Sequence, residues 1–459
     1  MTIPLRRSRL LLAALLASPA LAALPPNPGP GADGLAEVNT PPALQVIARD
    51  PGIQLVLHEA RPVIKGHGGW QPFLFCSGEG TLFCQAQLNA PPFHSKNKMV
   101  YPHLIGSAIS RDGGASWTRW THEENHDDVN NEGGMVQCAD GTILFLDTYV
   151  MPGAKPDHGI GEVWKSRDDF RTVEGPFFVD FYLPGIKWTG SSDDMGRPHQ
   201  AARLHRSILE MPNGDLLTTM YSWFGDDAAP CPYIPSMKKT RTVVIRSRDH
   251  GATWAYLATA AVDGAVGTEG FGEPVLVRVS QGVHAGRLLC LMRTGRELYG
   301  THSDDSGLTW SHPQPVAFPG VDIYATEQWQ ATFDPAGAAD RIPSDQMFGA
   351  EVDPELIEMH NGLLVCGVGI RVPQRGAARN WHVPQNGDYL AFSRDGGDTW
   401  SEVVQFRSGL PTTHYMGVRE LRPGVLFVVY DDSHWKLPLP GGTMGFQLEV
   451  SRADAAAAR

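Results

Sequence analysis

The chain has 459 residues, of which 42% are hydrophobic and 19% are charged, and its formal net charge is −12. This length and composition are typical of a globular protein with one large domain or several smaller ones. The negative charge argues against nucleic acid and against an anionic membrane surface as partners, because both would repel the chain.

The first 22 residues have the pattern of a bacterial signal peptide. Three of the first nine residues are arginine, an apolar run follows from Leu10 to Ala17, and Ala20-Leu21-Ala22 fits a cleavage site. The apolar run is too short to span a bilayer, and no other segment reads as a membrane span. We therefore expect residues 1–22 to be removed and the mature protein to be periplasmic or secreted. Residues 23–45, rich in Pro, Gly and Ala, are interpreted as a linker.

The six cysteines show no metal-ligand spacing such as C-x-x-C. Cys76 and Cys84 flank a turn, and a disulfide between them is one interpretation in an oxidising compartment. Cys138, Cys290 and Cys366 fall in apolar runs, where buried free thiols are expected.

An octet of the form S-x-D-x-G-x-[ST]-W is repeated along the chain. Its four full copies are Ser110–Trp117, Ser247–Trp254, Ser303–Trp310 and Ser393–Trp400. A fifth, altered copy at 166–173 has Phe170 in place of Gly and Val173 in place of Trp. The full copies follow short apolar runs and predict β-hairpin turns, in which Asp accepts backbone N–H groups and Gly supplies a positive φ.

A second repeat, a pair of apolar strands around a Gly turn, occurs six times. Its copies are Phe73–Gln85, Met135–Leu146, Ile208–Met220, Val275–Leu291, Leu356–Val368 and Val418–Val429. Six inner and five outer hairpins predict an all-β fold, a six-bladed β-propeller of four-stranded antiparallel blades over residues 46–452, with a tail at 453–459. We expect Ile53–His58 to complete the last blade beside Met444–Val450, because this closure removes two exposed sheet edges.

One position on each inner hairpin is polar where a core strand would carry Val, Ile or Leu. Counting nine residues back from each Gly turn gives Gln71, Glu132, His205, Glu273, Asp353 and Tyr415. These six residues are expected at one mouth of the central channel, where propellers bind ligands. A polar, water-filled channel without a function is the alternative interpretation.

The second strands of the hairpins return to the same mouth and bring Arg293 and Arg371 with them. Two guanidinium groups there would bind an anionic group. Trp70 and His414 are expected near the same mouth. Trp70 would offer a stacking face for a sugar ring; a role as a core aromatic residue explains Trp70 equally well.

Through its four octets the chain resembles the sialidase superfamily of six-bladed β-propellers, in which this octet is called the Asp-box. The box lies on the outer side of each blade in that family, so it says little about activity. The resemblance implies a glycoside hydrolase with a Tyr nucleophile in the last blade and an activating Glu in the fourth. Tyr415 and Glu273 match this pair by blade and register. Arg293 matches the second of three arginines that bind the substrate carboxylate, and Arg371, Arg375 or Arg379 would be the third.

The chain departs from the family pattern at two positions. No Arg stands at Trp70-Gln71-Pro72, where the family has its first-blade arginine, and Asn89–Tyr101 holds no Asp or Glu to act as the general acid. Proton transfer would then fall to His205, His414, Glu132 or Asp353, which are titratable and expected at the same mouth.

Three functions follow from this pattern. The first is a secreted, exo-acting, sialidase-like glycoside hydrolase for an acidic or unusual sugar, with Tyr415 as nucleophile and Glu273 as its base. The second is a polysaccharide lyase on a uronate-containing polymer, with His205 and Tyr415 as base and acid. The third is a non-catalytic propeller that binds a glycan or a protein. We expect a carbohydrate partner, no cofactor, no metal and a monomer; the paired acids at 127–128 and 193–194 are interpreted as solvated.

Overall fold

The structure is a computed structural model. It describes residues 42–65, 68–88, 104–120, 130–188, 192–194, 197–231, 237–321, 351–371, 385–408, 412–432 and 441–453. The expected signal peptide, most of the expected linker, Arg375 and Arg379 lie outside these residues. In the described part of the chain, no helix is long and apolar enough to cross a membrane.

The described regular structure is almost entirely β, with two short 3-10 turns, η1 (Asn131–Gly133) and η2 (Gly282–His284). One four-stranded sheet has the order β4-β5-β6-β7, with bounds Gly68–Cys76, Leu82–Leu88, Leu104–Ser110 and Thr118–Trp120. Another has the order β19-β20-β21-β22, with bounds Gly272–Arg278, Leu288–Arg293, Tyr299–Ser303 and Gln314–Pro315. These two sheets have the predicted number of strands.

Two further sheets each take strands from the N-terminal region. In the first, β1 (Gln45–Ala48) adds to β26-β25-β24-β23, with bounds Glu402–Ser408, Gly387–Ser393, Leu364–Ile370 and Glu351–Glu358. In the second, β2 (Ile53–Leu57) and β3 (Arg61–Ile64) pair with β29, followed by β28 and β27, with bounds Thr443–Arg452, Val425–Asp431 and Met416–Arg422. The pairing of β2 with β29 is the predicted closure. The strand β1 was not predicted, because its first residue fell in the expected linker.

The remaining large sheet joins two of the expected blades. Its order is β10-β11-β12-β18-β17-β16-β15-β8-β9, with bounds Tyr149–Pro152, His158–Ser166, Glu174–Tyr182, Thr253–Ala261, Arg241–Ser247, Leu216–Ser222, Ala202–Glu210, Met135–Gln137 and Ile143–Leu146. Two parallel pairings join the halves: the end of the nine-residue strand β12, Asp180–Tyr182, pairs with β18, and Ser207 of β15 pairs with Met135 of β8. A pairing of β10 with β15 closes part of this sheet on itself. A small hairpin, β13 (Ser192–Asp194) and β14 (Arg197–His199), stands apart.

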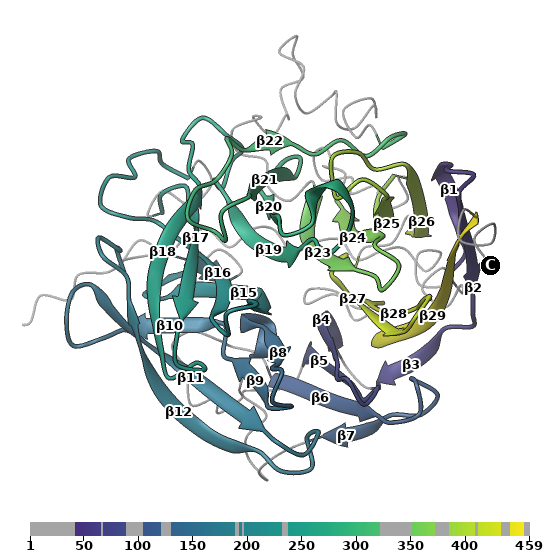
Figure 1. The fold of residues 1–459 in the computed structure, drawn as a ribbon, viewed down its shortest axis with the longest axis horizontal. Helices are drawn as coiled ribbons and strands as arrows, with labels where there is room; N and C mark the ends of the chain where they lie inside the picture. Colours follow the sequence, from purple (N-terminus) through teal and green to yellow (C-terminus); the bar gives the residue numbers. More distant parts are fainter. Residues whose placement is uncertain are drawn as a thin grey trace, which may run out of the picture.

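The large sheets are arranged around a common centre (Figure 1), and β4, β8, β15, β19, β23 and β27 lie closest to it. The N-terminal strands, in purple, lie beside the C-terminal strand β29, in yellow, so the two ends of the described chain meet. The hydrophobic core lies between neighbouring sheets; one cluster, for example, joins Phe406 of β26 to Tyr430 of β28 and Phe446 of β29. This packing fixes the innermost strands around the centre.

The octets form turns with one shared hydrogen-bond pattern. In the copy at 247–254, the Ser247 hydroxyl donates to Asp249 Oδ1 at 2.8 Å, and Asp249 accepts from the backbone N–H of Thr253 at 2.9 Å and from its hydroxyl at 2.6 Å. Gly251 has a φ of 82° and donates its N–H to Ser247 Oγ at 2.8 Å. The same bonds recur in the other copies.

The altered copy keeps this pattern although it lacks glycine. Phe170 has a φ of 62° and still donates its N–H to Ser166 Oγ at 2.9 Å. Its ring is buried and stacks on Phe83 of β5, with 5.2 Å between ring centroids. Contact with the neighbouring sheet therefore offsets the cost of a left-handed phenylalanine.

We expect Asp249→Ala to lower the free energy of unfolding by about 1–2 kcal/mol, because two donors of the turn lose their acceptor. Urea denaturation followed by tryptophan fluorescence measures this change. Arg248→Ala is the matched control, since Arg248 is exposed and has no hydrogen bond or ion pair among the described residues. Equal midpoints for the two variants would show that the octet bonds do not stabilise the fold.

All six cysteines are free thiols, including Cys76 and Cys84, so the disulfide interpretation is wrong for this structure. The register explains this: Cys84 pairs with Leu74 and Cys76 pairs with Leu82, which leaves the two cysteines diagonal rather than opposite. Burial raises the pKa of the Cys76 thiol to about 11, which keeps it protonated.

Candidate active site

The innermost strands share a backbone irregularity at the centre of the molecule. β4, β15, β19 and β23 each contain a bulge in their pairing. In each bulge a residue other than glycine has a positive φ: Gln71 at 51°, Arg206 at 54°, Glu273 at 42° and Asp353 at 49°. Such conformations are costly and concentrate at functional sites, and a bulge re-aims the side chains around it.

Tyr415, Glu273 and Arg293 come together from three strands. Glu273 lies in β19, Arg293 ends β20, and Tyr415 immediately precedes β27. The Tyr415 hydroxyl donates a hydrogen bond to Glu273 Oε1. Arg293 Nη1 donates to the same Glu273 oxygen at 2.8 Å and to the Tyr415 hydroxyl oxygen at 3.1 Å. The three residues predicted from register to share one mouth are therefore in direct contact.

The charges of this group hold Glu273 ionised and Tyr415 protonated. Burial disfavours the Glu273 carboxylate, but the charge of Arg293 and the hydrogen bonds from Tyr415 and Arg293 outweigh it and lower the Glu273 pKa to about 2. Burial, followed by the charge of Glu273, raises the pKa of Tyr415 well above its usual value. The pair is therefore a protonated phenol beside a carboxylate that can accept its proton.

Two further residues complete the surroundings of the Tyr415 hydroxyl. Arg371 lies over the Tyr415 ring, with its guanidinium carbon 5.3 Å from the ring centroid, and donates from Nε to the carbonyl oxygen of Thr413 at 2.9 Å. Glu269 accepts a hydrogen bond from Arg293 Nη2 at 2.9 Å, and 17% of its side chain is exposed. Register counting missed Glu269 because this residue precedes β19 and belongs to neither repeat.

Arg206 occupies the centre beneath this group, and sequence reasoning missed it as well. Its side chain is fully buried, and Nε lies 3.0 Å from Asp353 Oδ1. Its Nη atoms lie 3.5 Å from oxygens of Glu132 and Glu355, and they donate to backbone carbonyls of two other strands: Met416 at 2.6 Å and Pro72 at 3.1 Å. One guanidinium thus connects elements from across the ring.

Three of the four residues expected to transfer protons, Glu132, His205 and Asp353, lie around Arg206. Glu132, in η1, accepts from Arg203 at 3.2 Å, and His205 Nε2 lies 3.5 Å from Asp353 Oδ1. Burial raises the pKa of Asp353 well above its usual value, and the charge of Arg206 opposes this shift. At most 4% of each side chain of Glu132, His205 and Asp353 is exposed, so the structure separates them from solvent beneath Tyr415.

His205 predicts a specific dependence of stability on pH. Burial, followed by the charge of Arg206, lowers its pKa from 6.5 to about 4. The unfolded chain therefore binds the His205 proton at higher pH than the folded chain, and stability falls as pH drops from about 6.5 toward 4, by up to roughly 3 kcal/mol.

The change His205→Gln should flatten this part of the stability profile. Urea midpoints at pH 7, 5.5 and 4.5 measure the slope, and His360→Gln, at an exposed position, is the control. Parallel slopes in wild type and His205→Gln would contradict the assignment of this titration to His205.

The structure places the other predicted binding residues as follows. Gln71 is half-buried, accepts from the Gln87 amide through its side chain and donates its N–H to Asp431 Oδ2 at 3.1 Å. Only 2% of Trp70 is exposed, so its ring face does not reach the mouth as a stacking surface.

His414 Nδ1 lies 3.0 Å from Asp388 Oδ1 and His414 Nε2 lies 3.0 Å from the Asn386 amide nitrogen. Both ring nitrogens of His414 are thus engaged, and the residue braces the segment that carries Tyr415.

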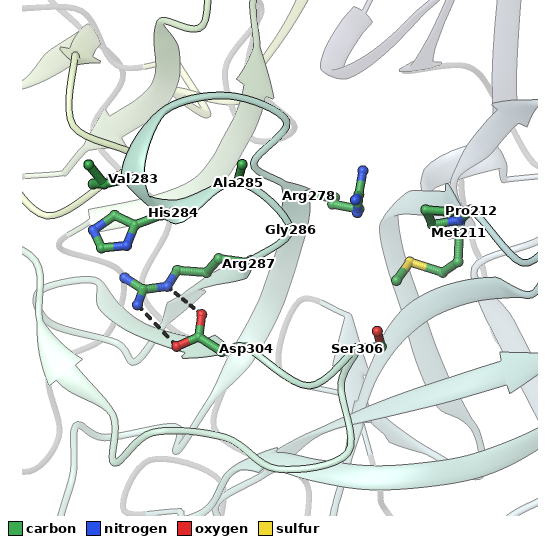
Figure 2. Close-up of a pocket in the computed structure, with 10 residues that line it drawn as sticks. All are labelled: Met211, Pro212, Arg278, Val283, His284, Ala285, Gly286, Arg287, Asp304 and Ser306. Atoms are coloured by element: carbon green, nitrogen blue, oxygen red, sulfur yellow. Dashed lines mark hydrogen bonds and ion pairs between the residues drawn. The ribbon is translucent and has the colours of Figure 1, made fainter.

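A hollow of about 380 Å³ lies next to turns that join the inner strands to their neighbours, at Met211-Pro212 and at Val283–Arg287 (Figure 2). Its wall includes Arg278 and an Arg287–Asp304 pair with 2.8 Å between Arg287 Nε and Asp304 Oδ1. None of the predicted site residues lines it.

No family model matches the chain, and a search of curated proteins finds no match. Solved structures do resemble it. A protein of unknown function from Dyadobacter fermentans matches with a TM-score of 0.59 at 17% identity, covering 87% of this chain and 100% of that one. A Hadza microbial sialidase matches with a TM-score of 0.51 at 16% identity, covering 84% and 66%. An α-L-arabinanase from Penicillium chrysogenum, complexed with arabinobiose, matches with a TM-score of 0.51 at 13% identity, covering 89% and 98%.

These likenesses show the fold. The chain has the all-β fold of propeller glycoside hydrolases that include both a sialidase and an arabinanase. The predicted resemblance to sialidases therefore holds for the fold, and the arabinanase widens the set of sugars that enzymes with this fold act on.

Proposed function

We propose that the protein is a glycoside hydrolase, exported from the cell, in which Tyr415 is the nucleophile and Glu273 its general base. The contact of the Tyr415 hydroxyl with Glu273 and Arg293 carries this proposal. The fold shared with a sialidase and an arabinanase supports it. We further propose that the sheets form six blades, the nine-stranded sheet comprising two that join at β12 and β18.

In the proposed reaction, the Tyr415 oxygen attacks the anomeric carbon of the sugar while its proton passes to Glu273. The bond from that carbon to the leaving oxygen breaks, and a glycosyl–tyrosine intermediate forms. The leaving oxygen keeps the electron pair and departs as an anion, as a phenolate does from an aryl glycoside. Water then attacks the same carbon and releases a proton to the solvent. The bond from the sugar to the Tyr415 oxygen breaks, and Glu273 returns its proton to that oxygen. A phenol with a raised pKa is a weak nucleophile on its own, so the adjacent carboxylate is essential to this scheme.

The alternative functions have less support. A non-catalytic binding protein has no need of a buried Tyr and Glu in hydrogen-bond contact. A lyase would use His205 as its base, and His205 is 1% exposed and enclosed by Pro274 and Asp353.

A panel of aryl glycosides tests the proposal, because a phenolate leaves without needing a proton. The panel should contain neutral sugars, such as arabinofuranosides, and acidic ones, such as sialosides and glucuronides. We expect phenolate release from at least one member, and a matching 2-fluoro sugar should label Tyr415, as read by peptide mass spectrometry. A separate incubation with uronate polymers, read for ultraviolet absorbance, tests elimination. Phenolate release with a label on another residue would refute the role of Tyr415, and absorbance without hydrolysis would favour the lyase.

A further inference from the structure

The charge of Arg293 is already matched by protein carboxylates. Its Nη1 donates to Glu273 at 2.8 Å and its Nη2 to Glu269 at 2.9 Å. A guanidinium that binds a substrate carboxylate presents two parallel N–H groups to it. Here both terminal nitrogens of Arg293 already face glutamate oxygens.

The other described positions at which a carboxylate clamp is expected are those of Arg371 and Gln71. Arg371 is directed at the carbonyl of Thr413 through Nε and Nη2. Gln71, which is uncharged, stands on β4, where the resemblance to sialidases implies an arginine. Among the described residues, two arginines, Arg293 and Arg371, and two glutamates, Glu273 and Glu269, thus belong to this group.

Glu269 is fixed in place by its backbone. Its N–H donates to the Thr294 carbonyl at 3.1 Å, and its carbonyl accepts from the Thr240 N–H at 2.8 Å. Gly270 follows with a φ of 79°, and a Cβ there would lie 2.3 Å from the Thr240 oxygen. This tight turn holds Glu269 beside Arg293 at the partly exposed side of the group.

We infer that Glu269 is a specificity-determining residue and that the site takes a sugar without a carboxylate next to the reacting carbon. The inference deepens the proposed function and rests on it, because only the proposed function makes the substrate a sugar. A substrate carboxylate on Arg293 would lie near Glu269, and two like charges about 6 Å apart at an effective dielectric constant of about 20 weaken binding by about a hundredfold. Salt and water at the mouth reduce this penalty, so we expect an effect of at least about tenfold.

Acetate, as a minimal carboxylate, tests this inference without any assumption about the sugar. The affinity of acetate is measured by NMR titration for wild type, Glu269→Gln and Glu269→Asp. We expect Glu269→Gln to bind acetate at least about tenfold more tightly than wild type, and Glu269→Asp, which keeps the charge, to resemble wild type. Glu174→Gln removes an exposed glutamate that pairs with Arg167 at 3.2 Å on the outer strand β12, and serves as the control. Circular dichroism confirms that each variant is folded.

The glycoside panel gives the second arm of the test. Turnover of neutral glycosides with little turnover of acidic ones supports the inference, and a preference of wild type for acidic glycosides overturns it. Equal acetate affinity in wild type and Glu269→Gln also overturns it, because Glu269 would then not exclude carboxylates. If no glycoside is cleaved, the proposed function fails, and the acetate comparison still decides the role of Glu269.

Discussion

Tyr415→Phe is expected to lower kcat by about three orders of magnitude or more, with substrate affinity changed only a few-fold. The change removes one oxygen atom, which in the proposed reaction forms the bond to the sugar. The ring is held between two guanidinium groups, with Arg206 and Arg371 at 5.7 and 5.3 Å from its centroid, and phenylalanine can keep that position. Steady-state kinetics on the best aryl glycoside measures kcat and KM separately.

Glu273→Gln completes this test. Loss of the base should reduce kcat by a factor of about 10² to 10⁴. Tyr256→Phe is the matched control: within the described part of the chain, the Tyr256 hydroxyl bonds to the Thr259 hydroxyl at 3.0 Å, in β18 and away from the site. Wild-type turnover in Tyr415→Phe would exclude Tyr415 as the nucleophile, and another residue would then have to carry out the hydrolysis.

The repeats made much of the architecture predictable. The octets supply the turn chemistry of five hairpins, and their serine and aspartate form the expected bonds even where Phe170 replaces glycine. The closure of β2 on β29 was predictable because a final blade without an outer strand leaves an exposed edge. The joining of β12 to β18 was not, since it depends on the length of β12 and on three residue pairs that no repeat encodes.

Register counting located part of the site for a physical reason. The Gly turns have positive φ, from 75° at Gly282 to 86° at Gly141, so a fixed count from each turn reaches the same height on each strand. That count brought Glu273 and Tyr415 to one place. The count did not find Arg206. The bulge in β15 places the side chains of two successive residues, His205 and Arg206, at the centre, and a count of one position per strand finds only the first. The expectation that Trp70 lies at the mouth was also wrong. Trp70 and Gln71 are neighbours on one strand, so their side chains point to opposite faces, and that of Trp70 is buried in the packed interior.

Arg206→Met is expected to lower the free energy of unfolding by roughly 3–5 kcal/mol, the largest stability effect we predict. The change leaves Asp353, Glu132 and Glu355 without the cation at their centre, and it also frees the carbonyl groups of Met416 and Pro72. The charge of Arg206 lowers the Asp353 pKa, so its loss would raise that pKa further in the folded state, and stability would fall as pH rises. The defect should therefore be smaller at pH 5 than at pH 8, as measured by urea denaturation.

A matched arginine separates burial from charge in this prediction. Arg419 pairs with Glu355 at 2.8 Å and 17% of its side chain is exposed, so Arg419→Met should cost less than half as much as Arg206→Met. The double change Arg206→Met with Asp353→Asn should recover part of the loss, because it removes one of the carboxyls left without a partner. If Arg206→Met were as stable as Arg419→Met at pH 8, the central guanidinium would not hold the ring together. In that case, the packing between neighbouring sheets alone would have to stabilise the strained backbone at Arg206 and Asp353.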